Sequence, residues 1–347
     1  MNWVARTGFV RNFWLNSDFR TSMKRKILPA AMILLLSGAV AASGDQRISL
    51  LPKLQPGKTL TYLVHCRGYK NVKTESSVAV PLAPAPSEID ADGLLRIEIV
   101  DVQRMSDRTA VQARGQILPR PPASADAATT VQKSSANPQN QALASKSIEF
   151  TISLDGSAEK VIGLEELDPA DQEVWRAWLA RFAAAWTIPA QRAKIGDKWS
   201  AEQPEPASSP IVALVWVRDS TYVRNEPCRS AQRSAAGEIF PSGGPEETCA
   251  VLLTTARLVQ NSSSKDATPE DFKLHELKTT GTAKGANEII TYISLTTGLV
   301  VRATEDANQQ MDVVVTRADG SNRVHYNVNA KSQSEVLLVT ETPPSRP

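Results

Sequence analysis

The sequence predicts a mainly β protein of the α+β class, with antiparallel curved sheets or meanders in two halves and one amphipathic helix. Most apolar runs alternate with a period of two, which is typical of half-buried antiparallel strands. Turn residues stand between these runs, and a single stretch has strong helical spacing. The composition, with 41% hydrophobic, 22% charged and 5% aromatic residues, excludes a collagen-like repeat, a polytopic membrane protein and a wholly disordered chain.

The N-terminus predicts export. A basic patch at Met23–Lys26 precedes an apolar run at 27–42 that ends in small residues, which is the layout of a secretory signal peptide. We therefore expect residues 1–43 to be an N-terminal extension plus signal peptide, with the functional start at Met23 and cleavage after Ala41 or Ala42. The alternative is an uncleaved anchor, which usually needs about 18 or more apolar residues. Cleavage predicts a periplasmic or secreted protein without a permanent membrane span.

The charge balance gives no electrostatic reason to expect a nucleic-acid partner. The whole chain has a formal net charge of +2, and residues 1–43 hold six Lys/Arg residues but one acid. The mature chain is therefore slightly acidic, and it has no cluster of Lys/Arg that could follow a phosphate backbone.

The first half is predicted at 44–202. Strand-like alternation occurs in the runs at 60–66, 95–99 and 148–154. Between the last two runs, residues 119–146 are dominated by Pro, Ala, Ser, Thr, Asn and Gln. Such a segment cannot bury a core, so it predicts a disordered insertion between strands.

One helix is predicted at 168–186. Asp168 suits the N-cap, and the proline that follows suits the first helical position. Trp175, Trp178, Phe182 and Trp186 recur at helical spacing and share one stripe. This stripe either packs the helix against a sheet or offers a platform to a ligand or partner, and the sequence leaves both open.

The second half is predicted at 211–342, after a polar linker at 203–210 and before a loose tail at 343–347. Gly298 and the pair Asp319-Gly320 fall between runs and predict hairpin turns. The strand-like runs of this half are 211–217, 250–258, 289–295, 299–303, 311–316, 323–328 and 336–339.

The three cysteines predict one disulfide. Cys228 and Cys249 flank a segment rich in Ser, Ala, Gly and Pro, and an oxidising compartment favours their pairing. Cys66 shares a strand face with apolar residues, so we expect a buried structural thiol; the alternative is a nucleophile.

The sequence contains no recognisable catalytic constellation, and we expect no metal site and no cofactor. His65, His275 and His325 have no Cys or acid at metal-ligand spacing around them. There is no nucleophile elbow, phosphate loop or dinucleotide fingerprint. Two Asp-Gly-Ser triplets, at 155–157 and 319–321, reverse the Asp-Thr/Ser-Gly order of aspartic proteases, so they predict hairpin turns.

Short motifs across the mature chain resemble those of uncharacterised exported bacterial proteins with two β-rich halves. The motifs are Leu54-Gln55-Pro56-Gly57 before a strand with Tyr62, then Ile195-Gly196-Asp197-Lys198-Trp199 after the helix, and a Tyr292 to Gly298 hairpin. More remotely, the chain resembles periplasmic lipoprotein carriers. That resemblance implies a curved antiparallel sheet around a hydrophobic cavity under a helical lid, although this chain has one strong helix where the carriers have several.

Two classes of function remain. The first is a non-catalytic envelope protein that binds a lipid or another hydrophobic ligand, a peptide or an envelope protein on an antiparallel β scaffold. The alternative is a secreted hydrolase that uses carboxylates such as Glu165, Glu166 and Asp168. Those acids also favour the positive end of the helix, so we expect the protein not to be an enzyme.

Overall fold

The computed structural model describes residues 47–76, 87–104, 109–118, 147–167, 169–205, 209–228 and 247–344. The predicted signal peptide within 1–43, the predicted insertion at 119–146 and Asp168 lie outside the described residues.

Eleven strands form one antiparallel sheet, in the order β5-β4-β3-β2-β1-β11-β10-β9-β8-β7-β6. The mainly β fold with antiparallel meanders and a curved sheet is thereby confirmed. Strands from both sides of residues 203–210 belong to this same sheet. The elements are β1 (Thr59–Ser76), β2 (Ser87–Arg104), β3 (Thr109–Leu118), β4 (Ser147–Ser153), β5 (Ser157–Ile162), η3 (Leu164–Glu166), α2 (Pro169–Ala184), β6 (Lys198–Pro204), β7 (Leu214–Pro227), β8 (Thr248–Gln260), α3 (Glu270–Leu274), β9 (Leu277–Ser294), β10 (Val300–Arg317) and β11 (Val324–Thr342).

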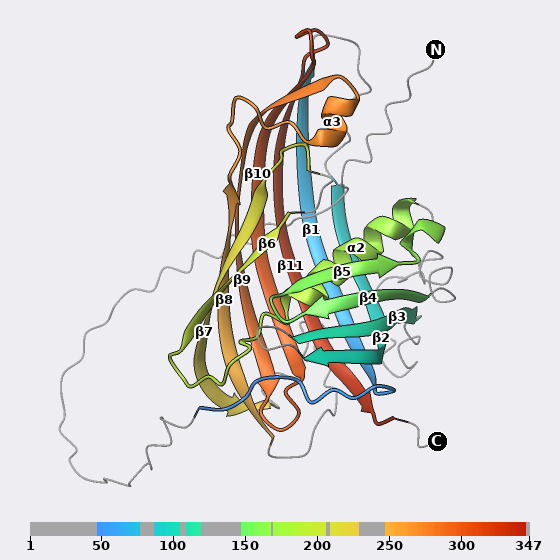
Figure 1. The fold of residues 1–347 in the computed structure, drawn as a ribbon, viewed down its shortest axis with the longest axis vertical. Coiled ribbons are helices and arrows are strands. Elements are labelled where there is room, and N and C mark those ends of the chain that lie inside the picture. Colours follow the sequence, from blue (N-terminus) through green and yellow to red (C-terminus); the bar gives the residue numbers. More distant parts are fainter. Residues whose placement is uncertain are drawn as a thin grey trace, which may run out of the picture.

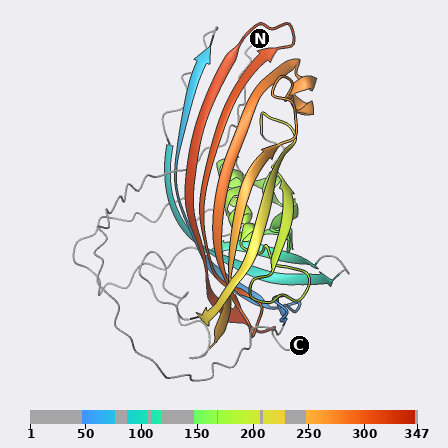
Figure 2. The same cartoon turned by 90° about the vertical axis from the view of Figure 1, so that its left-hand side faces the viewer.

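The chain leaves the centre of the sheet in one direction and returns to it from the other. From β1 it passes through β2, β3 and β4 to β5, one edge of the sheet. Helix α2 then carries it to β6, the opposite edge, and β7 to β10 lead back to β11, which pairs with β1 with Thr59 opposite Thr342. The sheet is strongly curved and α2 lies on its concave side (Figures 1 and 2).

Several strands are longer than the apolar runs that predicted them. β9 pairs with β10 from Leu277 to Ile293, whereas the predicted run begins at residue 289. β11 joins the runs predicted at 323–328 and 336–339 into one strand. Hydrogen bonds between neighbouring strands join backbone atoms and do not require apolar side chains. In the middle of both strands, residues on the concave face are polar, like those on the convex face. The strands therefore continue through segments that have no alternation of apolar and polar residues.

The main core lies between α2 and one half of the concave face, the half that carries the start of β1 and the end of β11. Trp175, Trp178, Phe182 and Trp186 are all buried there, and Tyr62 of β1 contacts Phe182 with ring centroids 5.0 Å apart. Trp186 lies just beyond the last helical residue, Ala184. The helix thus docks through the aromatic stripe that its sequence spacing predicted.

Glycines of the sheet make room for two of the indoles. A Cβ atom built on Gly93 of β2 would lie 1.7 Å from Cη2 of Trp178. One built on Gly115 of β3 would lie 3.3 Å from Cη2 of Trp175. In the middle of a strand, glycine commonly marks such a close approach, because it brings no side chain of its own.

A second, smaller apolar cluster fills the other end of the concave face. It contains Ile211, Leu214, Leu258, Ala267, Ala283 and Val313. Loop residues join it to the sheet through backbone bonds, with Val212 N donating to Ala267 O at 2.9 Å and Ala267 N donating to Thr279 O at 3.1 Å. The concave face therefore has two apolar ends.

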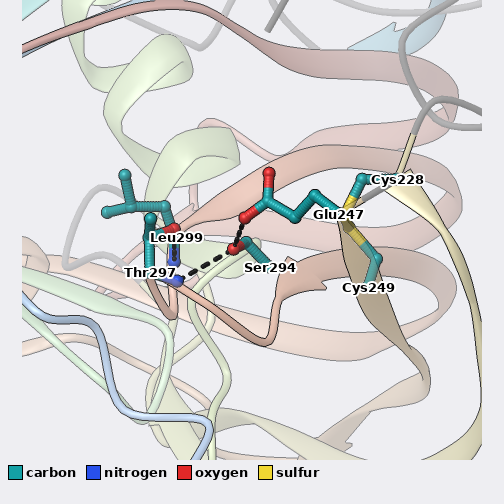
Figure 3. Close-up of a disulfide and its surroundings, with 6 residues drawn as sticks. All are labelled: Cys228, Glu247, Cys249, Ser294, Thr297 and Leu299. Carbon is teal, nitrogen blue, oxygen red and sulfur yellow. Dashed lines mark hydrogen bonds between the residues drawn. A yellow bond between two sulfur atoms is a disulfide. The ribbon is translucent and has the colours of Figure 1, made fainter. Parts of the chain in front are cut away.

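The disulfide lies at the start of β8 and is shown in Figure 3. Cys228 and Cys249 are bonded, as predicted, and both are buried beside Val301. Next to the bridge, the Ser294 hydroxyl donates to the Glu247 carboxylate and also accepts the N–H of Thr297 at 2.9 Å. These bonds tie the cross-linked strand end to the turn between β9 and β10.

Candidate binding site

The aromatic stripe of α2 is placed in the core, which corresponds to the packing alternative. Each of its four side chains is at most 3% exposed. The exposed large apolar side chains of the described residues lie elsewhere: Ile162, Ile195, Val212, Val223 and Leu274. A ligand role for Trp175, Trp178, Phe182 and Trp186 stays a prediction, and it would require these side chains to leave the core.

Of the carboxylates considered for hydrolysis, the structure describes Glu165 and Glu166, whereas Asp168 lies outside the described residues. Glu165 and Glu166 are exposed in η3, and the Glu165 carboxylate accepts the N–H of Gly163 at 3.2 Å. Within the residues that the structure describes, no three His, Cys, Asp or Glu side chains form a group that could hold a metal ion.

Both Asp-Gly-Ser triplets form the predicted hairpin turns. Asp155 Oδ1 accepts the N–H of Ser157 at 2.9 Å between β4 and β5, and Asp319 Oδ1 accepts the N–H of Ser321 at 2.8 Å between β10 and β11. The bonds to Ser321 lower the pKa of Asp319. Each glycine has a positive φ, 88° at Gly156 and 84° at Gly320, which explains the residue type.

A polar cluster separates the two apolar ends of the concave face. We call it the interior polar cluster, and it consists of Arg181, Glu205, Arg218, Asn287, Glu305, Ser332 and Ser334. The register places it there: Glu305 is opposite Ser334, one row beyond the apolar pair Ala303 and Val336. Three rows further, Met311 faces Val328 near the second apolar cluster.

The cluster joins α2 to the central strands. Arg181 Nε lies 3.5 Å from Glu305 Oε2, and Arg181 Nη2 donates to Ser332 Oγ at 3.1 Å. Glu305 also accepts bonds from Asn287 and, at 3.1 Å, from the Ser334 hydroxyl. A buried carboxylate needs such partners, so this network fixes the position of the helix on the sheet.

Burial sets the charge balance of the other two ionisable groups. Burial is the main cause that raises the pKa of Glu205, and the bond donated by Trp216 Nε1 opposes it. Burial also lowers the pKa of Arg218, against the attraction of Glu305, Asp155 and Glu205. These two side chains therefore sit where water no longer solvates their charged forms fully.

Arg218 also links the two edges of the curved sheet, the edge that ends in β5 and the edge that ends in β6. It lies on β7, is 6% exposed, and its Nη1 donates to the carbonyl of Gly156 at 3.0 Å. Gly156 belongs to the turn between β4 and β5, at the other end of the strand order. The buried guanidinium thus joins two segments that the sheet order places far apart. We call the region where β7 meets the turn between β4 and β5 the seam.

A pocket of about 510 Å³ lies at the seam. Its floor is the segment after α2, which is held on both sides: Ile188 N donates to Leu154 O and Ala193 N donates to Ile48 O, both at 2.8 Å. We call it the seam pocket. It is lined by Arg47, Thr109, Leu154, Asp155, residues 187–193 and residues 197–201.

The seam pocket has a mixed lining. The apolar part of the lining comes from Leu154, Ile188 and the partly buried Trp199. The charged residues of the lining are Arg47, Asp155, Arg192, Asp197 and Lys198. Asp197 is paired with Arg47 at 3.2 Å and accepts the N–H of Lys194 at 3.1 Å. The pocket therefore offers polar and charged groups beside a smaller apolar surface, and its volume lies within the usual range of ligand pockets.

Most of these pocket residues carry no sequence pattern that predicts a site. Asp197, Lys198 and Trp199 belong to a motif noted for its resemblance, but nothing marked them as lining a cavity. Arg47 and Arg192 have no sequence pattern that marks them, because only the folded sheet brings their two segments to the same pocket. Cys66 is buried on β1, as expected for a structural thiol.

Comparisons with known proteins give distant structural neighbours. No protein-family model matches the chain, and no curated protein matches it. A candidate exported protein with a YmcC-like fold from Bacteroides fragilis matches at 11% identity and a TM-score of 0.25, covering 86% of this chain and 100% of that one. A candidate lipoprotein from Parabacteroides distasonis matches at 10% identity and a TM-score of 0.26, with the same coverage of both chains.

These neighbours belong to the broad class that the sequence motifs resemble, exported bacterial proteins of unknown function. Among the described residues, no helix is both long enough and apolar enough to cross a membrane.

Proposed function

We propose that the protein is an exported, non-catalytic protein of the cell envelope that binds a ligand or a partner in the seam pocket. The observation that carries the proposal is the pocket itself: about 510 Å³, built from both edges of the sheet. This volume lies within the usual range of ligand sites, roughly 300–1,000 Å³.

Export is supported by two independent features. The pattern at 23–42 is that of a signal peptide, and the Cys228–Cys249 bridge suits an oxidising compartment outside the cytosol. The absence of a grouped catalytic set from the sequence motifs supports a binding role over hydrolysis.

The test fills the pocket and leaves the fold intact. Ala190 is exposed and lines the pocket, so Ala190→Trp places a large side chain in its mouth. Ala180 is exposed on α2 and does not line the pocket, so Ala180→Trp is the matched control. Native mass spectrometry of protein purified from its own envelope fraction measures what remains bound.

We expect the wild-type protein and the Ala180→Trp variant to carry a bound mass that disappears on denaturation. The Ala190→Trp variant is expected to bind the ligand at least about tenfold more weakly, equivalent to about 1.4 kcal/mol of binding free energy, and so to carry less of this mass. Equal occupancy of both variants would place the ligand elsewhere, and a bare wild-type protein would contradict the proposal.

A further inference from the structure

We propose that the seam pocket binds an extended, acidic peptide segment, which adds as a strand to the open edge of β6. The inference rests on the proposed function and deepens it by naming the class of ligand. Three features carry it: the edge strand in the pocket wall, the pattern of burial along that strand, and the charges left without partners.

β6 is the last strand of the sheet. It pairs with β7 along its whole length, from Lys198 to Pro204, and the strand order of the described residues places nothing on its other side. In an edge strand, every second residue directs its N–H and C=O away from the sheet. The outer edge of β6 therefore offers a row of unpaired backbone donors and acceptors.

The first half of β6 forms a wall of the seam pocket. Lys198, Trp199, Ser200 and Ala201 all line it. Along β6 the side chains alternate between exposed and half-buried, with none fully buried. The edge of β6 is thus accessible from the pocket. An extended peptide can form several backbone hydrogen bonds with such an edge.

The charges without partners in the pocket are positive. Arg192 and Lys198 both line it, are exposed, and have no ion-pair partner among the described residues. Of the acids nearby, Asp197 is paired with Arg47 at 3.2 Å. Asp155 accepts the Ser157 hydroxyl at 2.6 Å and attracts the buried Arg218, so its charge is directed toward that guanidinium.

One further carboxylate lies beside β6. Asp219 of β7 accepts a bond from the Ser200 hydroxyl at 2.6 Å, and this neutral donor does not cancel the charge of the carboxylate. Arg192 and Lys198 outnumber this one carboxylate, which favours carboxylate side chains on the incoming strand. A small anion alone would leave both the β6 edge and most of the pocket volume unused.

The experiment is calorimetric titration of the protein purified from its own envelope fraction. The probe is a peptide as long as β6, 7 residues, in which glutamate alternates with valine. Four comparison probes separate the contributions: the same peptide with lysine in place of glutamate, two versions with N-methyl groups on alternate sets of backbone amides, and inorganic phosphate. N-methylation removes the donors of one strand edge and keeps every charge.

We expect the glutamate peptide to bind about tenfold or more tightly than the lysine peptide, because Arg192 and Lys198 attract carboxylates and repel ammonium groups. One N-methylated version should lose binding and the other keep it, since only one edge of the peptide meets β6. Phosphate should not displace the peptide.

Charge reversal provides the matched variants. Combined Arg192→Glu and Lys198→Glu is expected to abolish the preference for the glutamate peptide, and Arg257→Glu, on an exposed site of β8, should keep it. Similar binding of both N-methylated versions would overturn strand addition. Displacement by phosphate, or equal binding of the lysine peptide, would overturn the acidic peptide.

The two proposals fail in distinguishable ways. If protein from the envelope carries a bound mass that Ala190→Trp removes, but the glutamate peptide does not bind, the pocket binds a different class of ligand and the peptide inference is wrong. If the wild-type protein carries no bound mass, the proposed function is wrong as well.

Discussion

At the residue scale, Glu205 is a carboxylate in a place that favours the neutral acid. Burial raises its pKa above the ordinary value near 4.5, although Trp216 donates a hydrogen bond to it. Below about pH 4.5 the group is protonated in both the folded and the unfolded protein, so it has no effect on stability. As the pH rises, the unfolded chain ionises first, and the folded state loses stability until the raised pKa has been passed.

The variant Glu205→Gln removes this loss and retains an acceptor oxygen for Trp216. We expect its stability advantage over the wild-type protein to be near zero at low pH and to grow toward neutral pH, by about 1.4 kcal/mol for each unit by which the pKa is raised. Urea unfolding at a series of pH values measures it. Glu202→Gln, at an exposed site on β6, is the control, and parallel pH profiles for both variants would contradict the expectation.

At the element scale, α2 depends on glycines of the sheet for its docking. The backbone of Gly93 is buried in β2 under Trp178, where a methyl group would collide with the indole. In an ordinary strand an alanine would stabilise slightly, because glycine loses more conformational entropy on folding. Here the collision decides the sign, and we expect Gly93→Ala to destabilise the protein by about 1–3 kcal/mol.

A double-mutant cycle separates this collision from other effects. Trp178→Phe alone leaves a cavity and destabilises the protein, but it removes the atom that the new methyl group would meet. The combined variant should therefore be less unstable than the sum of the two changes predicts, by at least about 0.5 kcal/mol. Additive changes in the free energy of unfolding would show that Trp178 does not limit the site.

At the scale of the whole molecule, Arg218 holds the seam together. Its bond to the Gly156 carbonyl joins β7 to the turn between β4 and β5. We expect Arg218→Met to lower the free energy of unfolding by about 1.5–3 kcal/mol, the usual contribution of a hydrogen bond to a charged group.

The loss should also be local to the seam. Amide hydrogen exchange should accelerate in residues 154–157 and 187–188 and stay unchanged in the interior of α2, which the main core holds separately. Arg257→Met, on the exposed face of β8, is the control. Uniform acceleration throughout the protein would contradict a specific role at the seam.

How far the sequence predicts the fold depends on the local signal at each element. The alternation at Ile148–Leu154 gave β4, and the aromatic spacing from Trp175 gave α2, because both patterns report burial on one face. The beginning of β9 was missed, since Thr, Gly, Lys and Asn there carry no apolar alternation although the ladder with β10 continues to Leu277. The seam pocket was missed because its walls come from segments far apart in the chain, and Arg47 and Arg192 are more than a hundred residues apart.

The sequence by itself determined the features that are local in the chain: the mainly β class, the single strong helix, the hairpin turns and the Cys228–Cys249 bridge, each of which depends on neighbouring residues or on one pairing. Only the tertiary structure decided that the strands form one sheet, that Arg218 reaches Gly156, and that Arg47, Arg192 and Lys198 line one pocket. These features depend on the curvature and register of many strands together, and no short stretch of sequence determines that combination.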